Sequence, residues 1–142
     1  MTGTNRKFLI FTLAGRRYAL DLAQVAEVVE QPATWPIPLA PPCYHGAMNF
    51  HGTIVAVMNL ALFLGLPGEY STEKTVVLDT RIASLAFSVE DIIRIIPQGQ
   101  AGLSEAPQDE AFACGRLNLP EGKVTLLDAA ALAEHAAMTI ND

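Results

Sequence analysis

The sequence predicts a mostly β protein, in which two small units of about five strands pack on a shared core. A short helix is expected in the middle of the chain and a longer helix near its end. Three observations predict this: a charge-free central segment, a second copy of its pattern later in the chain, and a length of 142 residues, which is that of one ordinary domain.

The central segment runs from Gly46 to Leu66 and contains no Lys, Arg, Asp or Glu. Within it, Thr53 to Met58 is β-branched and apolar, which is typical of a strand covered on both faces. Asn59 is a favoured N-cap, so we expect a short helix over Leu60–Leu64, ended by glycine and proline. A membrane-spanning helix needs about 20 apolar residues in a row, and this segment does not supply them.

Before this segment, the chain reads as strands and a loop. Phe8–Leu13 is apolar throughout and predicts a buried strand. Apolar and polar residues alternate from Arg17 to Leu22, which predicts a second strand that forms a hairpin with the first and has one solvent-exposed face. The valines of 25–29 favour a third strand. Gln31–Pro42 holds five of the nine prolines, so we expect an extended loop.

From Thr75 the pattern begins again. An offset of 67 residues aligns the first strands of the two halves, about 6–68 and 74–140, and places Leu20 on Phe87. After a loop in each half, a Gly-x-x-Asn motif and a further strand follow, at offsets of 69 to 70. The second copy ends on Asp128 as a cap and a helix from Ala129 to about Met138.

Composition favours a role in protein interaction. Hydrophobic residues make up 51% of the chain and charged residues only 17%, which leaves apolar surface for partners. The net charge of −6 and the lack of a Lys/Arg cluster argue against nucleic acid and anionic membranes as partners. Cys43 and Cys114 lack a metal spacing and are expected to be reduced thiols, and Arg6-Lys7 with its apolar run lacks a signal-peptide cleavage site. We therefore expect a cytoplasmic protein.

Candidates for chemistry are few. No P-loop, dinucleotide, nucleophile-elbow or zinc-protease motif occurs, and no cofactor is expected. Cys43, His45 and His51 could be metal ligands or a Cys/His nucleophilic pair, but their spacing matches no recurrent metal site. Ser88, with the acidic residues that follow it, could serve acid/base chemistry or form a solvated corner. Trp35 is either a partner anchor or a lid over the core.

The order of these motifs resembles the CheW-like family, the coupling proteins of bacterial chemotaxis and the related regulatory domain of CheA histidine kinases. The resemblance is carried by FTLAGRRYALDLAQVAEVVE, IPLAP, GAMNFHGTIVAVMNLALFLGL, SLAFSVEDIIRII and GKVTLLDAAAL, which span nearly all of residues 1–142. It implies one domain of two SH3-like β-barrels. It also implies a non-enzymatic adaptor between the cytoplasmic tips of chemoreceptors and a CheA-type kinase, associated with the membrane only through receptors.

The resemblance also implies partner-binding positions. Val25 and Glu27 match the V-x-E strand of the family, and Gly46 and Asn49 match its G-x-x-N motif. His51 stands where the family has Arg, which would weaken a charged contact near neutral pH because histidine is then only partly protonated. This chain also departs from the family pattern at Ala56 and Asn59, and these two differences are expected to have no effect. Two alternatives stay open: an adaptor of a non-chemotactic array with a divergent kinase, and a small Cys/His hydrolase.

Overall fold

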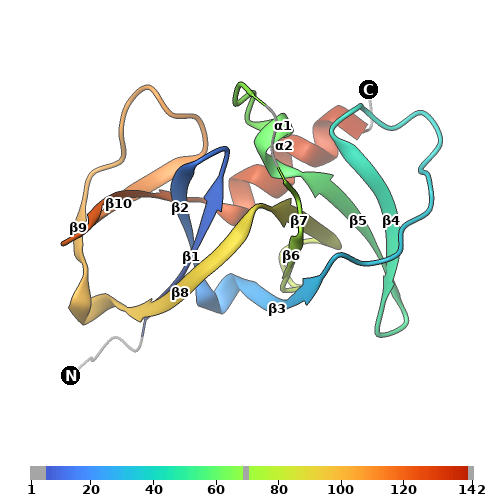
Figure 1. The fold of residues 1–142 in the computed structure, drawn as a ribbon. Helices are drawn as coiled ribbons and strands as arrows, with labels where there is room; N and C mark the ends of the chain where they lie inside the picture. The colour runs from blue at the N-terminus through green and yellow to red at the C-terminus, as the bar shows by residue number, and fades with distance from the viewer. Residues whose placement is uncertain (1–5, 69–70, 141–142) are drawn as a thin grey trace.

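The computed structural model describes residues 6–68 and 71–140, which form two β-sheets and two α-helices (Figure 1). The first sheet has the strand order β8 (Asp91–Pro97), β1 (Lys7–Leu13), β2 (Arg16–Asp21), β11 (Gly122–Leu127), β10 (Ala113–Leu119) and β9 (Gly102–Ser104). The second has the order β3 (Val25–Glu30), β6 (Lys74–Leu78), β7 (Leu85–Val89), β5 (Thr53–Asn59) and β4 (Tyr44–Phe50). The helices are α1 (Leu60–Phe63) and α2 (Ala129–Ile140), and two short 3₁₀ turns, η1 (Leu22–Gln24) and η2 (Gln98–Gln100), follow β2 and β8.

The 67-residue offset is confirmed in the strand pairing. Leu9 pairs with Leu20 in the β1–β2 hairpin, and the residues 67 positions later, Val76 and Phe87, pair in the β6–β7 hairpin. The third strands are exchanged between the halves, because β3 pairs with β6 and β8 pairs with β1. The last strands are exchanged too: β5 pairs with β7, and β11 pairs with β2, both in parallel. Each sheet is therefore built from strands of both halves.

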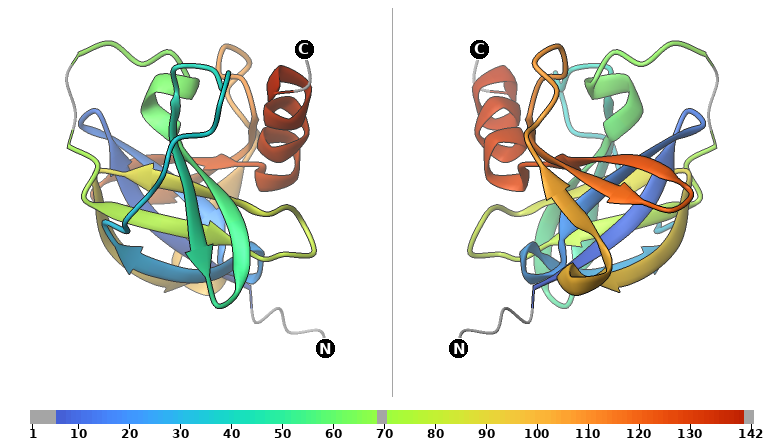
Figure 2. Two further views of the ribbon diagram at one scale, coloured as in Figure 1. Left: turned by 90° about the vertical axis from the view of Figure 1, so that its right-hand side faces the viewer. Right: turned by 90° about the vertical axis from the view of Figure 1, so that its left-hand side faces the viewer.

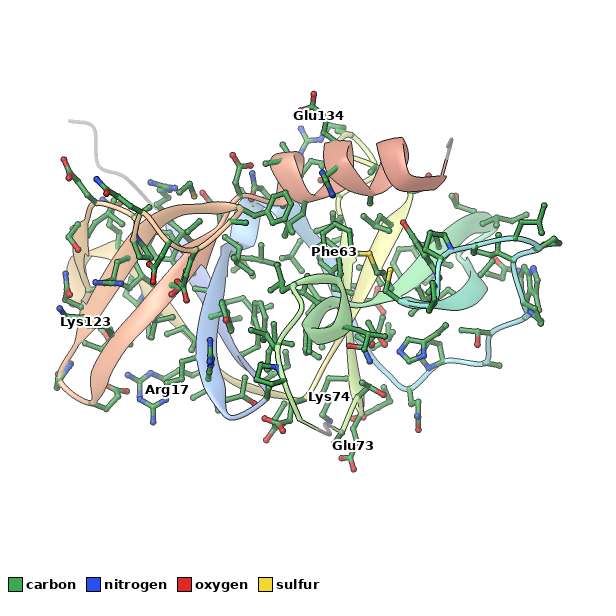
Figure 3. All side chains as sticks on the ribbon, turned by 90° about the horizontal axis from the view of Figure 1, so that it is seen from above. Arg17, Phe63, Glu73, Lys74, Lys123 and Glu134 are labelled. Carbon is green, nitrogen blue, oxygen red and sulfur yellow. The ribbon has the colours of Figure 1, made fainter. Side chains whose placement is uncertain are left out.

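A shared core joins the two sheets under α2. It contains Leu20 and Phe87, both fully buried as the repeat predicts, and Leu132 of α2 packs into it. Viewed from above, α2 lies alongside both sheets (Figure 3), and the side views show it on one side of the strands (Figure 2). Each sheet also has a smaller core of its own.

Local chemistry places both helices where the sequence predicts them. The Asn59 side-chain oxygen accepts a hydrogen bond from the Leu62 N–H at 3.1 Å, and the Asp128 carboxylate accepts one from the Ala131 N–H at the same distance. Such caps satisfy N–H groups that have no partner within the helix. Helix α1 ends one residue earlier than predicted, and α2 continues two residues further.

Three details differ from the sequence expectations. The expected solvent-exposed face of β2 is exposed at Arg17 but not at Ala19, which packs in the core of the first sheet, on the side opposite the shared core. The strand β5 is not covered along its whole length, because Ile54 near the hairpin tip is 67% exposed. The first sheet has six strands, not five, because the short β9 adds to its edge.

Candidate functional site

The tip of the β4–β5 hairpin is a two-residue turn formed by His51 and Gly52. Both residues have positive φ, 48° and 86°, as a type I′ turn requires. The Asn49 side-chain oxygen accepts a hydrogen bond from the Gly52 N–H at 2.8 Å and so holds the turn. His51 is thus itself in the left-handed region, which histidine tolerates better than most residues.

This turn brings together two of the predicted site residues. The His51 Nε2 lies 3.3 Å from a carboxylate oxygen of Glu27 on β3, and the His51 ring packs at 4.4 Å from the Phe50 ring. The two side chains remain 74% and 47% exposed. The contact links β3, at one edge of the second sheet, to the turn after β4, at its other edge. The sheet therefore curls until its two edges meet at this exposed polar pair.

An equivalent contact occurs in the other half with its charges reversed. Arg94 on β8 lies 67 positions after Glu27, and it pairs with Glu121, which precedes Gly122 as His51 precedes Gly52. A backbone hydrogen bond and the Arg94 guanidinium lower the pKa of Glu121. This second pair is charged over the whole neutral range, whereas His51 is charged only when protonated.

The remaining predicted site residues support the backbone. Gly46 is buried, and a Cβ at this position would lie 2.2 Å from the Trp35 carbonyl oxygen, so only glycine lets the proline-rich loop approach β4 so closely. The backbone of Trp35 pairs with Ala47 through two hydrogen bonds of 2.9 and 2.8 Å, while its side chain stays 46% exposed. Val25 is half-buried against the shared core.

Exposed apolar side chains lie on the edge strands β3 and β8. Val28 is 37% exposed, and Ile95, its equivalent at the 67-residue offset, is 50% exposed, with Ile93 at 45%. Edge strands offer unpaired backbone groups to other chains, so apolar residues along them are a feature of interaction surfaces. The sequence repeat aligned these positions but did not reveal that they are exposed.

The structure gives no support to the Cys/His nucleophile. His45 Nε2 hydrogen-bonds to the Ser88 hydroxyl at 2.7 Å, and His51 lies at the hairpin tip beside Glu27. Partial burial lowers the pKa of His45 and raises the pKa of the Cys43 thiol, whereas a nucleophilic cysteine needs a lowered pKa. Ser88 itself is buried, whereas the acidic residues after it, Glu90 and Asp91, lie at the turn between β7 and β8, where Asp91 is exposed. Among the described residues, no three His, Cys, Asp or Glu side chains gather in a group that could hold a metal ion.

Comparison with known proteins gives consistent results. The family model of the CheW-like domain matches residues 7–137. The chain is 23% identical over 107 residues to the chemotaxis protein CheW of Bacillus subtilis (strain 168), covering 74% of this chain and 69% of that protein. It is 26% identical over 89 residues to the chemotaxis protein CheW of Thermotoga maritima, covering 62% of this chain and 59% of that protein.

The fold is similar to the crystal structure of the scaffolding protein TtCheW from Thermoanaerobacter tengcongensis. The TM-score is 0.77 at 23% sequence identity, over 88% of this chain and 90% of that chain. The two sheets thus correspond to the two SH3-like subdomains of that fold. Within the described residues, no helix is long and apolar enough to cross a membrane.

Proposed function

The chain belongs to the CheW-like family, and from this premise we propose that it is a non-enzymatic adaptor of chemotaxis signalling in the cytoplasm. In this role it couples the cytoplasmic tips of chemoreceptors to the regulatory domain of a CheA-type histidine kinase. An adaptor needs at least two accessible surfaces, one for each partner. The exposed apolar and polar side chains of the two edge strands supply candidates for both.

The kinase-binding surface in this proposal lies around the Glu27–His51 contact, where the two edges of the second sheet meet. The observation that carries it is the exposed Glu27–His51 pair, with the Phe50 ring against His51 and the exposed Ile54 on the strand that follows the turn. Apolar side chains surrounded by accessible charged groups are typical of protein interfaces, where the charges set specificity and association rate. Val25, Gly46 and Asn49 would support the backbone that carries this surface.

The receptor surface in this proposal is the β8 edge. Ile93 and Ile95 offer an apolar strip, and helical partners commonly bind by laying an apolar face on such a strip. Assigning the two partners to different strands leaves both free to bind at once, which coupling requires.

Isothermal titration calorimetry with the regulatory domain of the kinase from the same genome, and separately with a receptor cytoplasmic fragment, tests the proposal. We expect micromolar or tighter binding to the kinase domain, as for an interface of ordinary size of about 1,600 Å². Glu27→Ala should weaken kinase binding only, and Ile95→Thr should weaken receptor binding only. Glu30→Ala is the matched control, since Glu30 is also exposed on β3 but pairs with Lys74. Absence of binding to both partners would contradict the proposal.

A further inference from the structure

The core of the second sheet ends in two buried hydroxyl groups. Among residues 6–68 and 71–140, the buried polar residues are Thr75 and Ser88, which are 1% and 3% exposed. They lie directly opposite each other on β6 and β7. Side chains two positions apart on a strand share a face, so both hydroxyls lie on the same side of the sheet as the core residues Val77 and Ala86.

A small cavity opens onto these two hydroxyls. It lies between the strands of the second sheet and the proline-rich loop that joins β3 to β4 (Figure 1), and its volume is about 80 Å³. Pro32 and Val57 are its apolar lining residues, and no Lys, Arg, Asp or Glu of the described chain lines it. The other lining residues are all polar: Gln31, Thr34, His45, Thr72, Thr75 and Ser88.

Ser88 already has hydrogen-bond partners, whereas Thr75 has none. The Ser88 Oγ lies 2.7 Å from His45 Nε2 and 3.4 Å from the Met58 carbonyl oxygen. A hydroxyl has one proton and two lone pairs, so the Ser88 Oγ keeps a lone pair free whichever of the two groups accepts its proton. Within the described ranges, no hydrogen bond reaches the Thr75 hydroxyl. A buried polar group without a partner is unfavourable, so the cavity favours a ligand that pairs with Thr75.

We propose that this cavity binds an uncharged carboxamide group. The carboxamide carbonyl accepts a hydrogen bond from the Thr75 hydroxyl, and the carboxamide N–H donates to the free lone pair of the Ser88 Oγ. A cavity of about 150 Å³ holds the six carbon atoms of benzene, so about 80 Å³ holds roughly three non-hydrogen atoms. A carboxamide group has that number.

Hydrogen bonding and charge argue against other groups of similar size. A carboxylate only accepts hydrogen bonds, so it cannot donate to the Ser88 Oγ. Burying its charge is also unfavourable where no Lys or Arg of the described chain lines the cavity, and the net charge of −6 adds to that cost. A hydrocarbon group would leave the Thr75 hydroxyl without a partner.

Two sources supply such a group. One is a free small amide, and the other is an asparagine or glutamine side chain of a bound protein, which rests on the adaptor role proposed above. Both can enter from outside, because Gln31, Thr34 and His45 are exposed at the rim of the cavity.

Nuclear magnetic resonance titration of the full, isotope-labelled chain with acetamide tests the site. We expect saturable shifts of the Thr75 and Ser88 backbone amide signals, with a dissociation constant on the order of 10 mM because so small a group binds weakly. Acetone has a methyl group in place of the amide nitrogen, and acetate carries a charge. Each should bind at least about tenfold more weakly than acetamide.

Variants at Thr75 separate the hydroxyl from the shape of the cavity. Thr75→Val replaces the hydroxyl with a methyl group and should weaken acetamide binding at least about tenfold, whereas Thr75→Ser keeps the hydroxyl and should retain binding. Thr53→Val is the matched control, because Thr53 is exposed at the start of β5 and outside the cavity. Dispersed amide spectra show that each variant is folded. An acetamide titration without shifts at molar concentration, acetone that binds as tightly, or a folded Thr75→Val that binds equally well would each overturn the proposal.

Calorimetry with the kinase regulatory domain and the receptor fragment identifies the source of the carboxamide. If one of these proteins supplies it, Thr75→Val should weaken the binding of that protein at least about fivefold, and Thr75→Ser should not. Unchanged binding of both proteins, together with saturable acetamide binding, assigns the site to a free small amide. The acetamide titration needs neither protein, so failure of the adaptor role would leave its result unchanged.

Discussion

Replacing His51 with arginine tests the Glu27–His51 contact directly. At 3.3 Å, two full charges in bulk water attract by about 1.3 kcal/mol, and side-chain entropy and salt reduce this to between about 0.2 and 1 kcal/mol for an exposed pair. The positive φ opposes the change, because histidine is several-fold enriched in the left-handed region relative to most residues, a preference of about 0.6 kcal/mol. The net change in unfolding free energy should therefore lie within about 0.5 kcal/mol.

Measuring the variant at two pH values separates the two contributions. The backbone cost is independent of pH, whereas arginine has an advantage over histidine only where histidine is neutral. Urea unfolding should therefore favour His51→Arg more at pH 8 than at pH 5.5, by up to about 1 kcal/mol. In the Glu27→Ala background this difference should disappear. A stability loss above about 2 kcal/mol, or an equal effect at both pH values, would refute the contact as described.

The same variant reports on the proposed kinase surface. If the partner presents an acidic group to this point, His51→Arg should strengthen binding by up to about 1 kcal/mol at low salt, and the gain should shrink as salt is added. If the partner is adapted to histidine, binding should weaken. Calorimetry that finds unchanged affinity for both kinase and receptor would remove His51 from either interface.

Further predictions concern the stability of the fold around the site. Gly46→Ala should cost about 2–4 kcal/mol in urea unfolding, because its Cβ meets the Trp35 backbone and its φ is positive; a cost below about 1 kcal/mol would show that the loop moves freely. Leu20→Ala and Phe87→Ala should each cost about 2–5 kcal/mol, since both are fully buried, and a cost near zero for either would contradict its place in the shared core. Burial lowers the pKa of His45, so the unfolded chain binds a proton more readily and stability should fall as the pH drops below about 6.5. A His45→Gln variant should lose that part of the pH dependence, and an identical pH profile would refute it.

Features governed by neighbouring residues could be predicted from the sequence. The caps at Asn59 and Asp128 and the strand β1 depend on local chemistry and apolar runs, and all lie where expected. The 67-residue offset also identified Leu20 and Phe87 as equivalent core positions. The caps and apolar runs span a few residues each, and the offset compares two such local patterns, so all of them can be read without knowledge of the tertiary structure.

Features that depend on distant pairing could not be predicted in this way. The alternation around β2 suggested a solvent-exposed face, but a second core of side chains from distant strands covers Ala19 on that face, while Arg17 stays exposed. The Glu27–His51 and His45–Ser88 contacts join residues 24 and 43 positions apart across a curled sheet. The close approach of Trp35 to Gly46 likewise needs the folded loop. The family resemblance marked Gly46 and Asn49 without telling surface contacts from backbone roles.

The exchange of strands between the halves affects how the chain folds as the ribosome makes it. When β1 to β5 have been synthesised, β5 can pair with β4, but the partner of β3, which is β6, and the second partner of β5, which is β7, do not yet exist. The strand β2 can pair with β1 at once, but its second neighbour in the first sheet, β11, follows every other strand of the described residues. The early product thus has open strand edges, and neither sheet can be completed from the first half alone. Long-range pairing of this kind folds slowly and exposes intermediates to aggregation, so newly made chains should depend on chaperones more than a helical adaptor of equal length.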